Sequence, residues 1–401
     1  MRNIFRGAET LELSAVGSVG ASKDAAVDND QFFDIKEIGA DLKLTFPRLL
    51  TPFNTKKIIP KHMFPSTRMS LALTSQTNVG LDKQTFTGAF NFKWFPKTTI
   101  TNRLDLFNVQ YVRNLNPDNY FGVYQNSYNT LNDISESINY NNGEDLTYPE
   151  QTDTFIDDVT NGNTSLTPED DDYKTVNAIG ERKTRLTENN LIFATNFNYV
   201  KDNRENLFDE NFSIFRLKLE LAGNLFSSFS QLLNLEKNSN NQYELFNVAY
   251  SQYVKIELDH IKHWDLGKKN VFAMRTFFGI AIPYGNSTNI PFSKSFFAGG
   301  TNDNRAWTAY SLGPGSSQSN DEFNEANLKL ALSVENRFNL FGDLYGALFI
   351  DVGNIWNVLD DVENEQATFS NFSSLKDIAI GSGFGLRYDF GFAVLRGDIG
   401  F

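Results

Sequence analysis

Hydrophobic and polar residues alternate along this chain in segments of about ten residues. From Asp377 to Asp389, one set of alternate positions reads Ile, Ile, Ser, Phe, Leu, Tyr, and the other reads Ala, Gly, Gly, Gly, Arg, Asp. Segments 212–224, 254–259 and 326–338 repeat the alternation, with charged residues among their polar positions. Successive side chains of a strand point to opposite faces of its sheet. Such frequent charges need water or partners, so the pattern favours a wet barrel interior over a packed sandwich core.

The same alternation predicts about thirteen strands, joined by connections of alternating length. The strands are expected near 8–20, 34–46, 67–76, 84–96, 99–112, 190–201, 212–224, 244–262, 269–282, 326–338, 343–354, 377–389 and 391–401. Short connections are 97–98, 202–211, 263–268, 339–342 and 390, and long ones are 21–33, 113–189, 225–243, 283–325 and 355–376. Two connections depart from this rule: 47–66 is long, basic and contains proline, and 77–83 is brief. We therefore predict an all-β, transmembrane, antiparallel meander β-barrel over residues 1–401.

Composition narrows the class of protein further. The mean hydropathy of −0.37 and the lack of any run of eighteen apolar residues argue against a helical membrane protein. The best apolar stretch, Val271–Ile282, is short and is broken by Arg275. A closed barrel is the other way to satisfy backbone polar groups in lipid. The net charge of −13 argues against nucleic-acid binding, and the absence of cysteine excludes disulfides and thiolate metal sites.

The longest connection, 113–189, is rich in Asn, Asp and Thr and includes the acidic run Glu169–Asp172. We expect it to form a long polar external loop. Calcium binding by the acidic run stays open as an alternative, because carboxylate oxygens suit that ion, although the spacing of an EF-hand loop is missing.

Aromatic residues fall near the ends of several predicted strands: Trp94, Phe95, Trp264, Tyr388 and Phe392. They are candidates for an aromatic girdle at the membrane–water interface. Ordinary strand aromatics are the equally weighted alternative.

Residues for catalysis or metal binding are scarce. His260 and His263 are three positions apart in a predicted strand and so point to opposite faces, which argues against zinc ligation. Ser316 and Ser317 lie in a Gly/Pro-rich loop with no histidine nearby in sequence. The G-x-S-x-G, Walker and H-E-x-x-H motifs do not occur. We therefore predict no enzymatic activity, no metal site and no cofactor.

One connection, 283–325, carries a distinctive motif. It contains Gly299–Gly300 followed by the tetrad Asn304–Arg305–Ala306–Trp307. If this loop folds back into a polar lumen, Arg305 needs carboxylate partners, because an unpaired buried charge is costly. Glu335 and Asp351 lie on the predicted lumen face of the next two strands. An external loop with a solvated arginine is the alternative.

These motifs resemble those of the BamA/TamA outer-membrane-protein assembly family, the bacterial surface antigen barrels. The sixth external loop of that family carries an aromatic–Gly–Gly run and then V-R-G-F or V-R-G-Y; here the Arg and the last aromatic match, but the Val and the Gly do not. An R-A-W version is similar to the TamA-like branch of the Bacteroidota. The segments 334–338 (V-E-N-R-F) and 349–356 (F-I-D-V-G-N-I-W) resemble the family's L-E-Y-R-F and F-x-D-x-G-x-x-W, and 384–390 with 395–401 resemble its penultimate hairpin.

The resemblance implies a function and a role for the loop. Gly299, Gly300, Arg305, Ala306 and Trp307 would form the loop motif, and Arg305 would pair with two lumen carboxylates, Glu335 and Asp351. The chain would be the barrel of an insertion or translocation factor in the Gram-negative outer membrane. Its partners would be outer-membrane lipid, unfolded outer-membrane protein clients, and periplasmic chaperones or accessory lipoproteins. A passive channel for small solutes and the translocator barrel of a secreted lipase stay open as alternatives.

The resemblance also implies departures from the whole family pattern. If the loop motif follows the family's eleventh strand, this chain holds about 13 of its 16 strands and should close incompletely. No POTRA repeats are present, and Met1–Gly7 leads into the first strand without an apolar export segment. The sequence is therefore expected to be a fragment of the C-terminal barrel.

Overall fold

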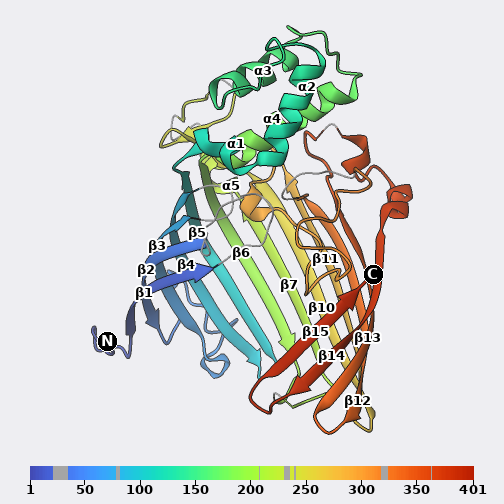
Figure 1. Ribbon diagram of the computed structural model, residues 1–401. Coiled ribbons are helices and arrows are strands. Elements are labelled where there is room, and N and C mark those ends of the chain that lie inside the picture. The colour runs from blue at the N-terminus through green and yellow to red at the C-terminus, as the bar shows by residue number, and fades with distance from the viewer. Residues whose placement is uncertain are drawn as a thin grey trace.

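A computed structural model of the chain describes residues 1–20, 35–77, 82–206, 208–229, 235–238, 241–317, 324–362 and 364–401. Its main feature is one antiparallel meander (Figure 1). In order of hydrogen bonding the strands are β1 (Thr10–Gly20), β2 (Ile35–Phe46), β3 (Ser66–Thr77), β4 (Lys83–Lys97), β5 (Ile100–Asn114), β6 (Asn190–Asp202), β7 (Ser213–Ala222), β10 (Tyr253–Gly267), β11 (Asn270–Pro283), β12 (Leu328–Phe341), β13 (Leu344–Trp356), β14 (Ala379–Asp389) and β15 (Val394–Gly400). The prediction of an all-β antiparallel meander is confirmed.

One predicted strand, 244–262, is wrong in its extent. It is divided into β8 (Glu244–Leu245), β9 (Val248–Ser251) and β10, and β9 pairs in parallel with β6 instead of continuing the meander. The division follows from Gln252, whose side chain and backbone bond the loop residues Asn286 and Ser287. The predicted connection 263–268 is correspondingly shorter, because β10 runs on to Gly267.

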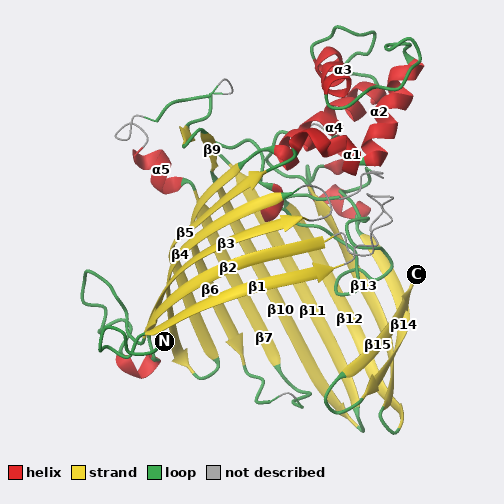
Figure 2. Cartoon of the chain, turned by 60° about the vertical axis from the view of Figure 1, so that its left-hand side comes forward, coloured by secondary structure: helices red, strands yellow, loops and turns green. Residues whose placement is uncertain are grey.

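The sheet has two free edges. Within the described residues, hydrogen bonds join each strand of the meander to its neighbours, and no ladder joins β1 to β15 (Figure 2). The predicted incomplete closure is therefore confirmed for this part of the chain. The predicted connection 21–33 lies outside the described residues, as do parts of 77–83, 202–211, 225–243, 283–325 and 355–376.

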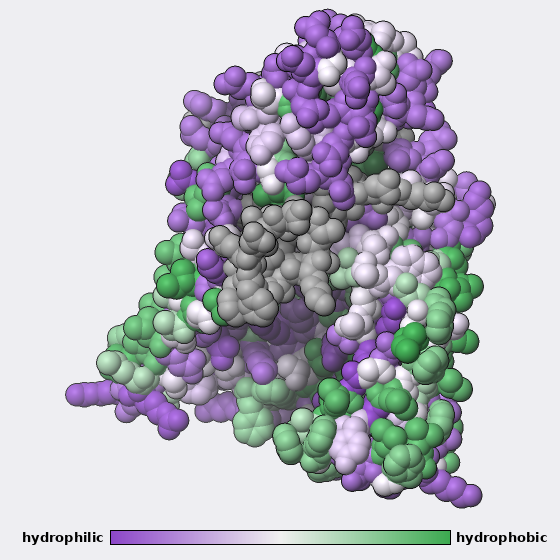
Figure 3. Space-filling view, viewed as in Figure 1, coloured by the Kyte–Doolittle hydropathy of each residue, from purple (hydrophilic) through white to green (hydrophobic). Residues whose placement is uncertain are grey.

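The two faces of the sheet differ as the alternation predicts. In β14, Ile380, Phe384 and Leu386 are exposed on one face, whereas Gly381 and Arg387 are buried on the other. Figure 3 shows hydrophobic residues along the outer flanks of the strands and hydrophilic ones in the hollow between them. The described helices are all too short or too polar to span a bilayer.

The stretch 113–189 contains helices that the sequence analysis did not predict. They are η2 (Pro117–Asn119), α1 (Tyr120–Val123), α2 (Gln125–Ser137), α3 (Glu150–Thr160) and α4 (Asp171–Thr187), and we call residues 117–187 the helical cap. The cap lies over the end of the sheet where the long connections meet (Figures 1 and 2). Shorter helices elsewhere are η1 (Lys61–Met63), α5 (Asn224–Phe229), η3 (Phe292–Lys294), η4 (Glu365–Ala367) and η5 (Phe372–Asp377).

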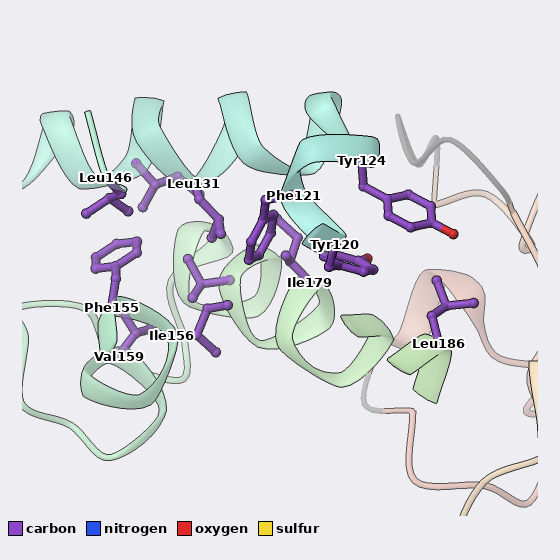
Figure 4. Packing of buried hydrophobic residues seen from close by; sticks show 12 residues of the cluster. Tyr120, Phe121, Tyr124, Leu131, Leu146, Phe155, Ile156, Val159, Ile179 and Leu186 are labelled. Carbon is purple, nitrogen blue, oxygen red and sulfur yellow. The ribbon is translucent and has the colours of Figure 1, made fainter. Parts of the chain in front are cut away.

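The helical cap has a hydrophobic core of its own (Figure 4). Its few apolar side chains fall at helical spacing, so each helix presents one apolar stripe to the others. The fully buried members include Tyr120, Phe121, Leu131, Phe155 and Val159. The polar composition of the stretch hid this spacing, which is why only a long polar external loop was expected.

The acidic run at 169–172 marks the start of α4. Asp170 accepts hydrogen bonds from the backbone N–H and the hydroxyl of Thr167. These hydrogen bonds stabilise the carboxylate and hold the pKa of Asp170 below its usual range. Acidic residues stabilise a helix at its N-terminus. Across the described residues, no cluster of three or more His, Asp or Glu side chains is arranged to hold a metal ion. The run therefore has a structural explanation without calcium.

The cap core yields the first prediction. Phe155→Ala should destabilise the cap by about 3–5 kcal/mol, because it removes a fully buried ring from a small core. Amide hydrogen exchange over residues 117–187 should then speed up while exchange in the strands stays unchanged. Asp157→Ala, on the exposed side of the same helix, is the matched control and should leave exchange unaltered. Equal protection in both variants would contradict an independent cap core.

Candidate functional site in the lumen

The described parts of the connection between β11 and β12, residues 284–317 and 324–327, fold back along the lumen face of the sheet. The base of this connection is closed by a pair of backbone hydrogen bonds between Phe296 and Ala326. Beyond this base, Gly300 donates to the carbonyl oxygen of Trp307, and Tyr310 donates to that of Ala298. These bonds form a narrow turn that carries Arg305 at its tip. We call residues 296–310 the lumen loop.

Gly299 and Gly300 make the turn possible. Their φ angles are +90° and +100°, a region that residues with a Cβ adopt only under strain. A Cβ on Gly299 would also overlap the carbonyl oxygen of Thr308 on the returning strand of the turn. The double glycine therefore sets the close approach that brings the tetrad back onto the sheet.

Arg305 reaches three carboxylates on three different strands. Its Nε and Nη2 bind the two oxygens of Asp351 on β13, at 2.7 and 2.9 Å. Its Nη1 lies 2.6 Å from Glu335 of β12 and 3.2 Å from Asp398 of β15. The guanidinium carbon also lies 3.4 Å from the centre of the Phe349 ring. The structure thus brings together the three residues that the sequence analysis expected to pair, and it adds Asp398.

The side chains around Arg305 form a larger charge network. Arg387 of β14 binds Glu335 at 2.9 Å and Asp398 at 3.3 Å, Arg337 binds Glu335 at 2.5 Å, and Arg396 binds Asp398 at 2.7 Å. Four arginines therefore surround three carboxylates. The Arg305 side chain is only 7% exposed. A guanidinium is a strong partner here because its planar N–H groups can bind several carboxylates at once.

Sequence reasoning missed Asp398 and Arg387, although the signal was present. Both occupy polar positions of alternating segments and so were expected to face the lumen. What alternation does not give is the register between neighbouring strands. In the structure, Asp398 pairs with Gly385, which places it beside Arg387 and within reach of the lumen loop.

A strip of glycines on β14 and β15 receives the tetrad. A Cβ on Gly381 would lie 2.6 Å from the side-chain oxygen of Asn304 and 2.7 Å from Cβ of Ala306. A Cβ on Gly400 would lie 2.6 Å from the carbonyl oxygen of Arg305. Trp307 is half-buried and packs against a core cluster that includes Phe296 and Ala298 of the loop itself. The backbone of the tetrad therefore lies directly on the sheet, in space that larger residues would fill.

A second set of contacts holds the opposite flank of the lumen loop. Lys329 Nζ donates to the carbonyl oxygen of Phe297 at 2.6 Å and pairs with Asp303 at 3.0 Å. Arg275 donates to the carbonyl oxygen of Asn302 and pairs with Asp259 of β10. Between this flank and the wall lies a cavity of about 390 Å³, lined by residues that include Phe277 and Ser333.

The loop is also joined to the helical cap. Arg185 of α4 pairs with Glu325 at 2.9 Å, and Phe292 and Tyr310 pack against the cap core. The connection 284–327 therefore contacts the cap at one end and the charge network at the other.

The remaining candidates of the sequence analysis are not brought into this site. His260 bonds the hydroxyl of Ser213, whereas the ring of His263 stacks against Phe212. Ser316 bonds the backbone of Gln366, and the hydroxyl of Ser317 bonds the carbonyl oxygen of Pro314. These residues have local structural partners.

Comparison with known proteins adds a family. The family described as the Omp85 superfamily domain matches residues 8–401. Similar solved structures include the crystal structure of BamA from Haemophilus ducreyi lacking POTRA domains 1–3, which is 12% identical with a TM-score of 0.53 and covers 98% of this chain and 66% of that chain. CdiB from Escherichia coli is 9% identical with a TM-score of 0.43, covering 100% of this chain and 53% of that one. This chain spans just under two thirds of the first and about half of the second. No curated protein matches.

Removing the central cation should release the lumen loop. Arg305→Ala leaves Glu335, Asp351 and Asp398 without their shared partner, and loss of one member of a buried ion pair costs about 3–5 kcal/mol. Proteolytic cleavage within 296–310 of the folded, detergent-solubilised chain should accelerate. Arg103→Ala removes an ion pair with Asp105 on β5 that contacts neither the loop nor its partners and is the matched control. If both variants are cleaved like the parent, the network does not hold the loop.

The glycine strip gives an independent test. Gly400→Ala should displace the tetrad, because its Cβ would press on the backbone of Arg305, at a cost of about 1–3 kcal/mol. Gly397→Ala, on the same strand, is the control, since no atom lies within 4 Å of its Cβ position. Cleavage of the loop should rise in the first variant alone. The same cleavage rate in both would show that the loop does not rest on β15.

Proposed function

This chain belongs to the Omp85 superfamily, and we propose that it acts as the barrel of a factor that inserts or translocates other outer-membrane proteins. The chain is an outer-membrane β-barrel protein of the Gram-negative cell envelope. The proposal concerns its activity: the clients are unfolded outer-membrane proteins, and periplasmic chaperones or accessory lipoproteins would deliver them. A relation to the TamA-like branch of the Bacteroidota stays a prediction.

The observation that carries the proposal is the binding of one loop cation to β12, β13 and β15 together. Within the described residues, the backbone ladder joins β15 only to β14 and so supports it on one side. The contacts of Arg305 and Arg387 with Asp398 supply a second attachment from inside the lumen. This attachment uses side chains on the lumen face and occupies none of the backbone N–H and C=O groups along the outer edge of β15.

An unobstructed edge can accept another strand. Exposed N–H and C=O groups along an edge form hydrogen bonds with an incoming extended segment, and such strand addition is a common mode of peptide binding. No covalent step is needed. The contribution of the lumen network would be to keep β15 in one position while its outer edge exchanges partners.

The position of the lumen loop supports insertion or translocation over passive conduction. A passive channel needs a continuous water-filled path lined by selective charges. Here the charges on β12 to β15 are paired with one another and with Arg305, and the loop lies across them. Charges engaged in this way are poor ligands for a passing solute.

The proposal predicts a loss of client assembly. In the organism that encodes this chain, Arg305→Ala should reduce the amount of other folded outer-membrane proteins, because β15 loses its attachment from inside the lumen. The measurement is the heat-modifiable gel mobility of the clients, normalised to the amount of the variant itself. Asp398→Asn should reduce it too, whereas Arg103→Ala should not. Normal client folding at a normal level of Arg305→Ala would contradict the proposed function.

A further inference from the structure

The connection between β2 and β3, residues 47–65, differs in charge from the rest of the chain. It contains Arg48, Lys56, Lys57 and Lys61 and no Asp or Glu, in a protein with a net charge of −13. Arg48 and the three lysines are exposed. The ion pairs found in the described part of the chain do not include these three lysines. We call this segment the basic loop.

The basic loop is folded and not an extended tether. Ile58 and Ile59 both donate to the carbonyl oxygen of Thr55, and Met63 donates to that of Pro60. At its root, the hydroxyl of Thr67 donates to the carbonyl oxygen of Arg48 at 2.8 Å and accepts from the N–H of Leu50 at 2.9 Å. The backbone that carries the cations therefore has a defined fold.

Large apolar side chains stand exposed among these cations. Phe53, Ile58 and Phe64 are 68%, 77% and 75% exposed. Phe64 also adopts a positive φ of 46°, which is unusual for a residue with a bulky side chain. A water-facing loop has no use for three such side chains, because each loses the favourable free energy of burial.

The basic loop lies at the level where the strands leave the apolar band. In an antiparallel meander, the β2–β3 connection is at the same end of the sheet as the short turns, and Figure 2 shows it flaring away from the foot of these strands. The short turns at this end also expose apolar side chains: Phe208, Leu266, Phe341, Phe390 and Phe392. Trp94, Phe95, Trp264 and Tyr388, the candidate girdle residues, lie near the same end of their strands. Exposed aromatics at one level are typical of a membrane–water interface.

We propose that the basic loop binds the headgroups of anionic phospholipids beside the barrel, with Phe53, Ile58 and Phe64 inserted into the interface. Exposed lysines next to apolar side chains form the combination that binds peripheral segments to anionic bilayers. The outer face of β2 and β3 is apolar, with the paired residues Leu42 and Leu71 exposed, so the loop continues a surface that already faces lipid. This binding is independent of client insertion. It would fix the rotation and depth of the β1–β5 side of the sheet in the leaflet.

The test uses the cysteine-free chain reconstituted into bilayers. Asn54→Cys places one thiol in the basic loop for an environment-sensitive fluorophore, and brominated phosphatidylcholine serves as the quencher. Quenching should be about twofold or more greater in phosphatidylcholine bilayers that contain phosphatidylglycerol than in phosphatidylcholine alone, and added salt should reverse the difference. Neutralising the three loop lysines to Gln should abolish the difference. Phe53→Ser with Phe64→Ser should lower quenching in both bilayers.

The matched control removes three lysines at the opposite end of the barrel: Lys174→Gln, Lys237→Gln and Lys376→Gln, which should leave the difference intact. Equal quenching in the two lipid compositions, or equal quenching after the loop lysines are neutralised, would overturn the proposal. A fluorophore that stays in water in both compositions would overturn it as well and would point to a protein partner for this surface.

Discussion

The arrangement of the lumen depends on where the charge of Arg305 is placed. A guanidinium held away from water is tolerated only where carboxylates meet its N–H groups, and here three of them do so from β12, β13 and β15. The requirement acts on the loop and on the sheet together. The loop must turn sharply at Gly299 to deliver the cation, and the strands must keep a register that aligns their carboxylates.

The charge network also explains why the lumen faces of β14 and β15 carry glycines next to it. Gly381, Gly383 and Gly385 occupy successive lumen positions of β14, and Gly400 continues the strip on β15. Glycine in a strand interior weakens it, so a run of this kind needs a compensating contact. The compensation is close packing on this face: Cβ atoms on Gly381 and Gly400 would overlap the lumen loop, and those on Gly383 and Gly385 would overlap the carbonyl oxygen of Ile399 and the carboxylate of Asp398. Charge pairing and steric fit thus support the same contact, and β15 is held from the lumen as well as by its ladder.

Much of this architecture could be predicted from the sequence, because a strand with one water-facing and one lipid-facing side has a residue pattern that repeats every two positions. The same period placed Glu335 and Asp351 on the lumen face. Asp398 was missed because its nearness to Arg305 follows from register across β14 and β15, which alternation does not encode. The helical cap was missed because its apolar residues are sparse within a polar stretch, and only their spacing distinguishes them. The break at Gln252 depends on hydrogen bonds to a distant loop and left no local signal.

The central claim is that Arg305 holds the lumen loop against β15. The most direct test of this claim is a measurement of the distance between the loop and the strand. Because the chain has no cysteine, Thr308→Cys and Ile399→Cys give two exposed labelling sites, one on the loop and one on the outer face of the strand. Double electron–electron resonance between spin labels at these sites should give one narrow distance distribution, which broadens when Arg305→Ala is added. A distribution that is already broad in the parent, or one that Arg305→Ala leaves unchanged, would contradict the account.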